Sequence, residues 1–201
     1  MAYSDFSLES VIRQFKLMES ETLIFEPVVP IEPSHWLAET LSITQKFGLK
    51  AGTEKARSEF VVAPILAELE RRNPNQIAIF SGKSLDVNRA AGLNGECDFI
   101  ISKGEMSRIL QAPILAVVEA KKQDIDLGLG QCVAQVIGAQ LFNQQQQQDI
   151  ETVYGCVTTG DRWQFLRLQQ QHLVLDNREY SLTRELPLIL GILQSIVHFV
   201  Q

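Results

Sequence analysis

Two apolar stretches in the middle of the chain carry charged side chains of types that can do chemistry. The stretch PILAVVEAKK is an apolar run that ends in Glu119-Ala120-Lys121. Because strand side chains alternate, Glu119 and Lys121 are expected on one face, with the small Ala120 between them. Asp98 interrupts a second apolar stretch, ECDFIIS. A buried charge is costly unless it is paired or bound to a metal, so the pattern indicates either a chemical site or a solvated strand end.

Hydrophobic periodicity predicts an α/β layout around these residues. A broad apolar stripe predicts helices at 53–73 and 126–143, and Pro64 predicts a kink or a later start in the first of them. Alternation and β-branched content predict strands at 76–87, 96–102, 113–122 and 152–159, the first two of which form an antiparallel hairpin. Further elements are predicted as helices at 7–19, 34–46 and 186–200 and strands at 163–168 and 172–176. In this layout Glu59, Asp98, Glu119 and Lys121 can meet at one end of the sheet.

Composition indicates one globular domain and excludes several classes of site. The 201 residues are 45% hydrophobic and 21% charged, with a formal net charge of -6, which argues against a broad nucleic-acid-binding surface but not against a local basic cleft. No apolar run has the length of a membrane span, and an acidic N-terminus is unlike a signal peptide, so a cytoplasmic location is expected. Three cysteines at wide spacing predict reduced core thiols, and three scattered histidines do not predict a metal site.

The chain resembles the PD-(D/E)xK nuclease superfamily over residues 53–168. The resemblance rests on Gly95-Glu96-Cys97-Asp98-Phe99-Ile100-Ile101, followed by Glu119-Ala120-Lys121 on a later strand, between two predicted helices. The nearest likeness is to the nuclease domains of type I restriction motor subunits. The chain departs from the pattern at Cys97, where the motif often has proline, and at Gln135, where a helical Gln-x-x-x-Tyr motif would have tyrosine after Gln131.

This resemblance implies a restriction endonuclease-like αβββαβ core with a mixed central sheet flanked by helices. Residues 1–50 would be an N-terminal helical extension, and residues 169–201 a C-terminal strand and helix on the same single domain.

The resemblance also implies a Mg²⁺-dependent, or Mn²⁺-dependent, endonuclease that hydrolyses phosphodiester bonds. Asp98, Glu119 and the carbonyl of Ala120 would bind the metal, and Glu59 would be the family's helical acid. Lys121 would position or activate the attacking water. Gln131 or Gln135 would hold water or a phosphate oxygen.

Nucleic acid, with DNA as the expected form, is therefore the predicted partner. Lys83, Lys122 and Arg162 are the candidate phosphate contacts near the predicted site. The apolar last helix could form the interface of a homodimer or with a partner subunit. The favoured interpretation is that it covers the sheet.

Two alternatives remain. One is a catalytically silent nuclease-like module that binds nucleic acid or protein. The other is an interaction protein in which the Glu-x-Lys triplet is coincidental.

Overall fold

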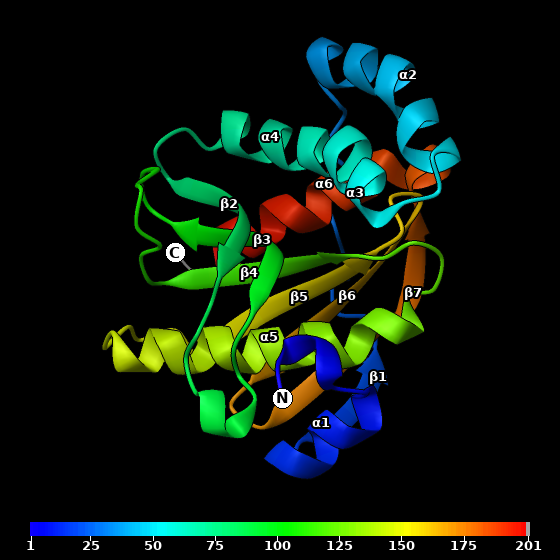
Figure 1. The fold of residues 1–201 in the computed structure, drawn as a ribbon. Helices are drawn as coiled ribbons and strands as arrows, with labels where there is room; N and C mark the ends of the chain where they lie inside the picture. Colours follow the sequence, from blue (N-terminus) through cyan, green and yellow to red (C-terminus); the bar gives the residue numbers. More distant parts are fainter. Residues whose placement is uncertain (200–201) are drawn as a thin grey trace.

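The computed structural model describes residues 1–199, which contain one mixed sheet of seven strands with helices on both faces (Figure 1). The strand order is β1-β7-β6-β5-β4-β3-β2, and the pairs β1–β7 and β4–β5 are parallel while the others are antiparallel. The strands are β1 (Met18–Thr22), β2 (Ile77–Ser84), β3 (Glu96–Lys103), β4 (Ile114–Ala120), β5 (Thr152–Thr158), β6 (Arg162–Gln169) and β7 (His172–Ser181). The helices are α1 (Leu8–Phe15), α2 (His35–Lys50), α3 (Glu54–Arg57), α4 (Ala63–Arg72), α5 (Asp126–Gln145) and α6 (Leu182–Phe199). Short helical turns form η1 (Tyr3–Asp5), η2 (Ser58–Val62) and η3 (Arg89–Ala91).

The predicted α/β class, with a mixed sheet flanked by helices, is confirmed. Along the chain the central elements follow the order α4, β2, β3, β4, α5, β5. β2 and β3 pair antiparallel, as the short connection between them predicts. Every residue of β4 is buried, in agreement with its continuous apolar run.

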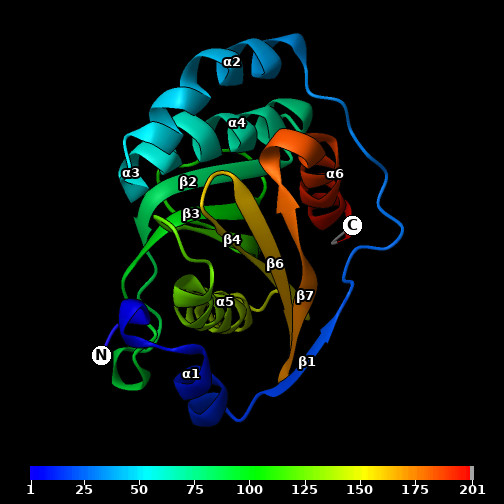
Figure 2. The same ribbon diagram turned by 90° about the vertical axis from the view of Figure 1, so that its right-hand side faces the viewer.

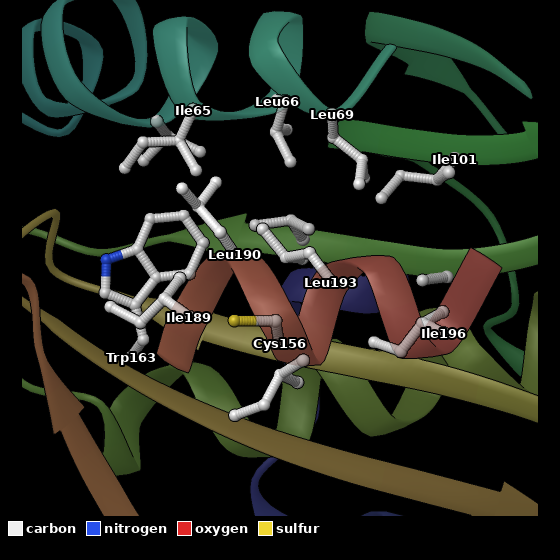
Figure 3. Packing of buried hydrophobic residues seen from close by; sticks show 14 of the residues in the cluster. Ile65, Leu66, Leu69, Ile101, Cys156, Trp163, Ile189, Leu190, Leu193 and Ile196 are labelled. Atoms are coloured by element: carbon white, nitrogen blue, oxygen red, sulfur yellow. The ribbon is translucent and has the colours of Figure 1, made fainter. Parts of the chain in front are cut away.

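Figure 2 shows helices on both faces of the sheet. Two apolar clusters hold these helical layers to it. On one face, α4 and α6 cover strand residues such as Ile101 and Trp163. Figure 3 shows Leu190 and Leu193 of α6 in this layer. On the other face, α5 and the N-terminal segment cover residues such as Ile100. Successive side chains of the central strands thus pack against the helices on opposite faces of the sheet.

Strict alternation ends at the start of β3. The sequence predicts that Cys97 shares a face with Phe99 and Ile101, yet Cys97 packs in the cluster beneath α5 with Ile100. Gly82 lies opposite this point of β3, between the pairs Ser81–Phe99 and Lys83–Cys97, and its φ of 60° is not extended. The partner strand β2 thus departs from extended backbone at the position opposite Asp98.

The strand β1 was not predicted by the sequence pattern, which extends the first helix to residue 19. Its sequence, Met-Glu-Ser-Glu-Thr, is exposed at all five positions and carries no apolar alternation. It forms because its backbone adds to the edge of the sheet, parallel to β7. A long connector then leads from β1 around the outside of the molecule to α2 (Figure 2).

The predicted helix at 53–73 is divided by the π-helical turn η2. Pro64 has no N–H to donate to the carbonyl of Phe60, four residues earlier. The hydroxyl of Thr44, on α2, donates to that carbonyl instead, at 2.7 Å. The later start expected from Pro64 is therefore observed, because α4 begins at Ala63, directly after the π turn.

The last helix covers the sheet, as the favoured interpretation of its sequence predicts. Its apolar side chains Ile189, Leu193 and Ile196 are buried within the chain (Figure 3). Val200, the last residue of the predicted helix, lies outside the described residues. Among the residues that the structure describes, no helix has the length and apolar content needed to cross a membrane.

Glu68 joins two helices through a fully buried carboxylate. Its oxygens accept from the Ser34 hydroxyl at 2.8 Å, at the start of α2, and from Arg72 Nε at 2.8 Å, and Arg71 Nε lies 3.2 Å away. Burial alone would raise the pKa of Glu68, but the hydrogen bonds from Ser34, Arg71 and Arg72 hold it below its ordinary value.

Replacing Glu68 with glutamine is expected to lower the free energy of unfolding by about 2 kcal/mol at pH 7, because the two arginines lose a charged partner and one of its two acceptor oxygens. The folded-state pKa is depressed, so this stabilisation is present above the unfolded-state pKa and is lost as pH falls through the folded value. The stability difference between the two proteins in denaturant titrations should therefore begin to shrink as pH falls below about 4.3. A stability difference that stays constant down to pH 3 would contradict this assignment.

Candidate active site

The candidate site lies where β4 ends, on the face of the sheet that α5 covers. Asp98 on β3 faces the end of β4, and its Oδ2 accepts a hydrogen bond from the backbone N–H of Ala120 at 2.7 Å. Glu119 is the residue before Ala120, and Lys121 is the residue after it. The neighbouring strand β5 runs parallel, and the Lys121 N–H donates to the Thr158 carbonyl at its end. Both strands thus end at the same edge, which is where open α/β sheets usually bind ligands.

Two glutamines of α5 complete a hydrogen-bonded cluster around Glu119 and Lys121. Lys121 Nζ donates to Glu119 Oε1 at 2.7 Å and to Gln131 Oε1 at 3.0 Å. Gln135 Nε2 donates to the other carboxylate oxygen of Glu119 at 2.8 Å. Because residues four apart lie on one side of a helix, both glutamines reach the strand end together.

The cluster is largely removed from water but not sealed. The side chain of Glu119 is 3% exposed and that of Lys121 is 16% exposed, while Asp98 is half-buried. Glu119 is thus the most buried member of the cluster, and Asp98 and Lys121 keep some exposure to solvent.

Burial disfavours the charged forms of both acids, and the charge of Asp98 adds to this effect at Glu119. Burial raises the pKa of Asp98, although the Ala120 N–H and Lys121 act in the opposite direction. Burial, followed by the charge of Asp98, raises the pKa of Glu119. Burial alone would lower the pKa of Lys121, but the charge and hydrogen bond of Glu119 raise it above its ordinary value. Lys121 lowers the pKa of Glu119 through its charge and hydrogen bond but does not cancel the rise that burial and Asp98 cause.

The oxygen donors at this site fit a hard divalent cation. The described residues contain no group of three or more His, Cys, Asp or Glu side chains that could hold a metal ion. They do place two carboxylates, Asp98 and Glu119, within each other's electrostatic field. Mg²⁺ keeps several waters and needs only one or two carboxylates, whereas structural zinc needs four ligands. The buried Oε1 of Gln135 has no hydrogen-bond partner among the described residues, so it can accept from an ordered water.

Glu59 is not brought to this cluster. It lies on η2, its side chain is 55% exposed, and its carboxylate is 3.8 Å from Lys55 Nζ. Glu54, at the start of α3, is the helical acid whose charge reaches the site, where it raises the pKa of both Asp98 and Lys121. Glu54 and Glu59 are five positions apart in a helical segment, so their side chains point in different directions from it. Glu59, the predicted helical acid, therefore lies apart from the cluster, and Glu54 is a helical acid whose charge acts on Asp98.

Replacing Glu54 with glutamine is expected to weaken Mg²⁺ binding by about fivefold, since one nearby negative charge is lost. Glu59→Gln is the matched control and is expected to leave binding unchanged. The midpoint of Mg²⁺-dependent thermal stabilisation measures the effect without requiring catalysis. Equal midpoints for the two variants would contradict the assignment of Glu54 to the site.

The three predicted phosphate contacts are not in one place. Lys83 lies on β2, and its Nζ donates to the carbonyl of Arg108 at 3.3 Å. Lys122 and Arg162 line one pocket beside the end of β4 and β5, together with Arg57, which the sequence analysis did not select.

Gly128 is a positioning residue that the sequence analysis did not identify. It lies in the first turn of α5, and a Cβ at this position would be 2.8 Å from Cγ of Lys121 and 2.6 Å from Cγ1 of Val157. The absence of a side chain at Gly128 thus gives Lys121 its room. Glycine destabilises a helix relative to alanine, so a glycine within a predicted helix suggests a close contact at that position. This was the signal in the sequence that could have identified Gly128.

Replacing Gly128 with alanine is expected to reduce turnover by tenfold to about 100-fold, because the added methyl group displaces Lys121. Gly138→Ala is the matched control on the same helix, where a Cβ would be 2.2 Å from the Tyr3 hydroxyl oxygen. Both variants should lose about 1–3 kcal/mol of stability from overpacking. Turnover per folded molecule, measured below both melting temperatures, should fall for Gly128→Ala alone, and an equal loss in both would exclude a positioning role.

Comparison of the sequence with protein-family models and with curated proteins finds no match.

Proposed function

We propose that this protein is a metal-dependent endonuclease of the PD-(D/E)xK type, with DNA as its expected substrate. The observation that carries the proposal is the convergence of Asp98, Glu119 and Lys121 at the end of β4. The order α4, β2, β3, β4, α5, β5 supports it, because this is the αβββαβ order that the motif implies. The two glutamines from α5 support it further, since they hold Lys121 and Glu119 in place.

Asp98 and Glu119 would hold Mg²⁺ or Mn²⁺, together with the carbonyl of Ala120. Such a cation, when bound, supplies charge stabilisation for a phosphate oxygen and lowers the pKa of a water molecule. The chain prepares this site by keeping two acids in a partly buried position where a dication relieves their repulsion.

Lys121 would position the attacking water and offset negative charge that develops on the phosphate. An ammonium group has three donors, and two of them are directed at Glu119 and Gln131. The third donor is left for a water or a phosphate oxygen. Gln131 fixes the ammonium group from the helix side, and Gln135 fixes the Glu119 carboxylate, so neither group has to reorganise when substrate binds.

A cleavage assay with the complete chain tests this function. Supercoiled plasmid and labelled single- and double-stranded oligonucleotides are incubated with Mg²⁺, with Mn²⁺, or with EDTA. Cleavage that requires the metal is expected for at least one substrate. If no substrate is cut with either metal while oligonucleotides still bind in a salt-dependent way, the protein is a catalytically silent binding module and the enzymatic proposal is wrong.

A further inference from the structure

A basic pocket lies directly beside the candidate active site. It has a volume of about 340 Å³ and is lined by residues from four segments: the end of α2, the end of α3, the residues that follow Lys121, and the turn from β5 into β6. Lys122 connects the two places, because it follows Lys121 in the chain. The remaining residues that carry the argument are Arg57, Thr159, Asp161 and Arg162.

The charge of this pocket is opposite to that of the whole chain. Three cations, Arg57, Lys122 and Arg162, line it with a single acid, Asp161. The chain as a whole has a formal net charge of -6. Three cations brought together by separate elements therefore form a local basic site on an acidic protein.

Both arginines are held in place by the backbone of the pocket wall. Arg57 Nη1 donates to the Thr159 carbonyl, and its buried Nε has no hydrogen-bond partner among the described residues. Arg162 Nη2 donates to the Gln123 carbonyl at 2.9 Å, and its Nη1 is 3.1 Å from Glu179. Anchored side chains lose little rotational freedom when an anion binds.

Lys122 has a free ammonium group at the same place. The Lys122 side chain is exposed, and it forms no hydrogen bond or ion pair with another described residue. A free ammonium beside two oriented guanidinium groups is the arrangement that binds phosphate, in which arginine supplies directed donors and lysine a mobile charge.

We propose that this pocket is a second phosphate subsite, which binds a backbone phosphate of the nucleic-acid strand that enters the active site. The inference rests on the proposed nuclease function for the identity of its ligand. Its role is to fix the strand so that the neighbouring phosphodiester lies at Asp98, Glu119 and Lys121. Inorganic phosphate shares the same chemistry and is the other source of ligand to be distinguished.

Binding measurements test the subsite independently of cleavage. The probes are fluorescein-labelled 20-mer oligonucleotides, single- and double-stranded, in EDTA, with anisotropy as the readout. Lys122→Gln and Arg162→Gln alter exposed side chains and are each expected to weaken binding by about tenfold. Each should also reduce the slope of log K against log salt by about 1. Arg13→Gln, on α1, is the matched control, because it removes the same charge from an exposed arginine that pairs with one acid, Glu9.

The outcomes separate this subsite from the nuclease proposal. The subsite proposal is wrong if both pocket variants keep the wild-type affinity and salt dependence, or if Arg13→Gln loses as much affinity as they do. This holds even if the wild type cleaves DNA. Weaker binding in the pocket variants would support the subsite even if no cleavage is found.

Titration with inorganic phosphate at constant ionic strength distinguishes the two ligands. If Lys122→Gln and Arg162→Gln weaken phosphate binding but leave oligonucleotide binding unchanged, the pocket is a site for the free anion and the proposal fails. The other outcome supports the proposal. If the pocket variants bind the oligonucleotide more weakly, and if phosphate displaces the oligonucleotide less effectively from these variants than from the wild type, the ligand of the pocket is a strand phosphate.

Discussion

Replacing Lys121 with methionine is expected to reduce the single-turnover cleavage rate by about 10²- to 10⁴-fold, the range observed when a positioned proton donor or acceptor is removed. Methionine keeps an unbranched apolar stem but cannot donate to Glu119 or Gln131, which Lys121 contacts at 2.7 Å and 3.0 Å. The measurement is the rate at saturating enzyme with a labelled oligonucleotide and Mg²⁺. Substrate affinity, measured in EDTA, should change far less than the rate.

Lys55→Met provides the matched control for this prediction. Lys55 is an exposed lysine 3.8 Å from Glu59, and it contributes to neither the cluster nor the basic pocket. Its loss is expected to leave the rate within about twofold of wild type, because exposed ion pairs contribute little. If Lys121→Met cuts DNA as fast as Lys55→Met, Lys121 has no part in the reaction.

Replacing Asp98 with asparagine is expected to abolish most cleavage without lowering stability. The loss of one metal-binding carboxylate should cost several kcal/mol of transition-state stabilisation, or more than about 10²-fold in rate. The asparagine oxygen can still accept from the Ala120 N–H, which Asp98 contacts at 2.7 Å. Because burial raises the pKa of Asp98, its charge is disfavoured in the fold, and a neutral side chain removes that cost.

Thermal unfolding with and without Mg²⁺ tests this second prediction. The wild type should gain about 2.7 kcal/mol at a Mg²⁺ concentration 100 times the dissociation constant, and Asp98→Asn should gain much less. Asp149→Asn, an exposed acid in the loop after α5, should respond to Mg²⁺ like the wild type. A metal-free melting temperature well below wild type for Asp98→Asn would mean that the carboxylate stabilises the fold, contrary to this account.

The elements that carry the site could be predicted from the sequence because their side-chain patterns are strong. The continuous apolar run of β4 predicts a strand buried on both faces, and the stripe of α5 predicts a helix over it, with Gln131 and Gln135 on one side. The strand β1 gave no such signal. Its side chains are all exposed, and its conformation is set by backbone pairing with β7 at the sheet edge.

The sequence by itself determined which residues can do chemistry: an acid on β3, and an acid and a lysine two residues apart at the end of β4. Only the tertiary structure decided which distant groups join them. Glu54 and Glu59 belong to the same helical segment and have the same chemistry, so their local pattern does not distinguish them. The turn of the helix brings the charge of Glu54 to Asp98 and leaves Glu59 in solvent near Lys55.

The tertiary structure also decided two other features. Gly128 gives Lys121 its room, and Arg57 approaches Lys122 and Arg162. A sequence pattern reports local conformation and burial. Which side chains meet depends on how separate elements pack and on their rotation about their own axes, and those are properties of the folded chain as a whole.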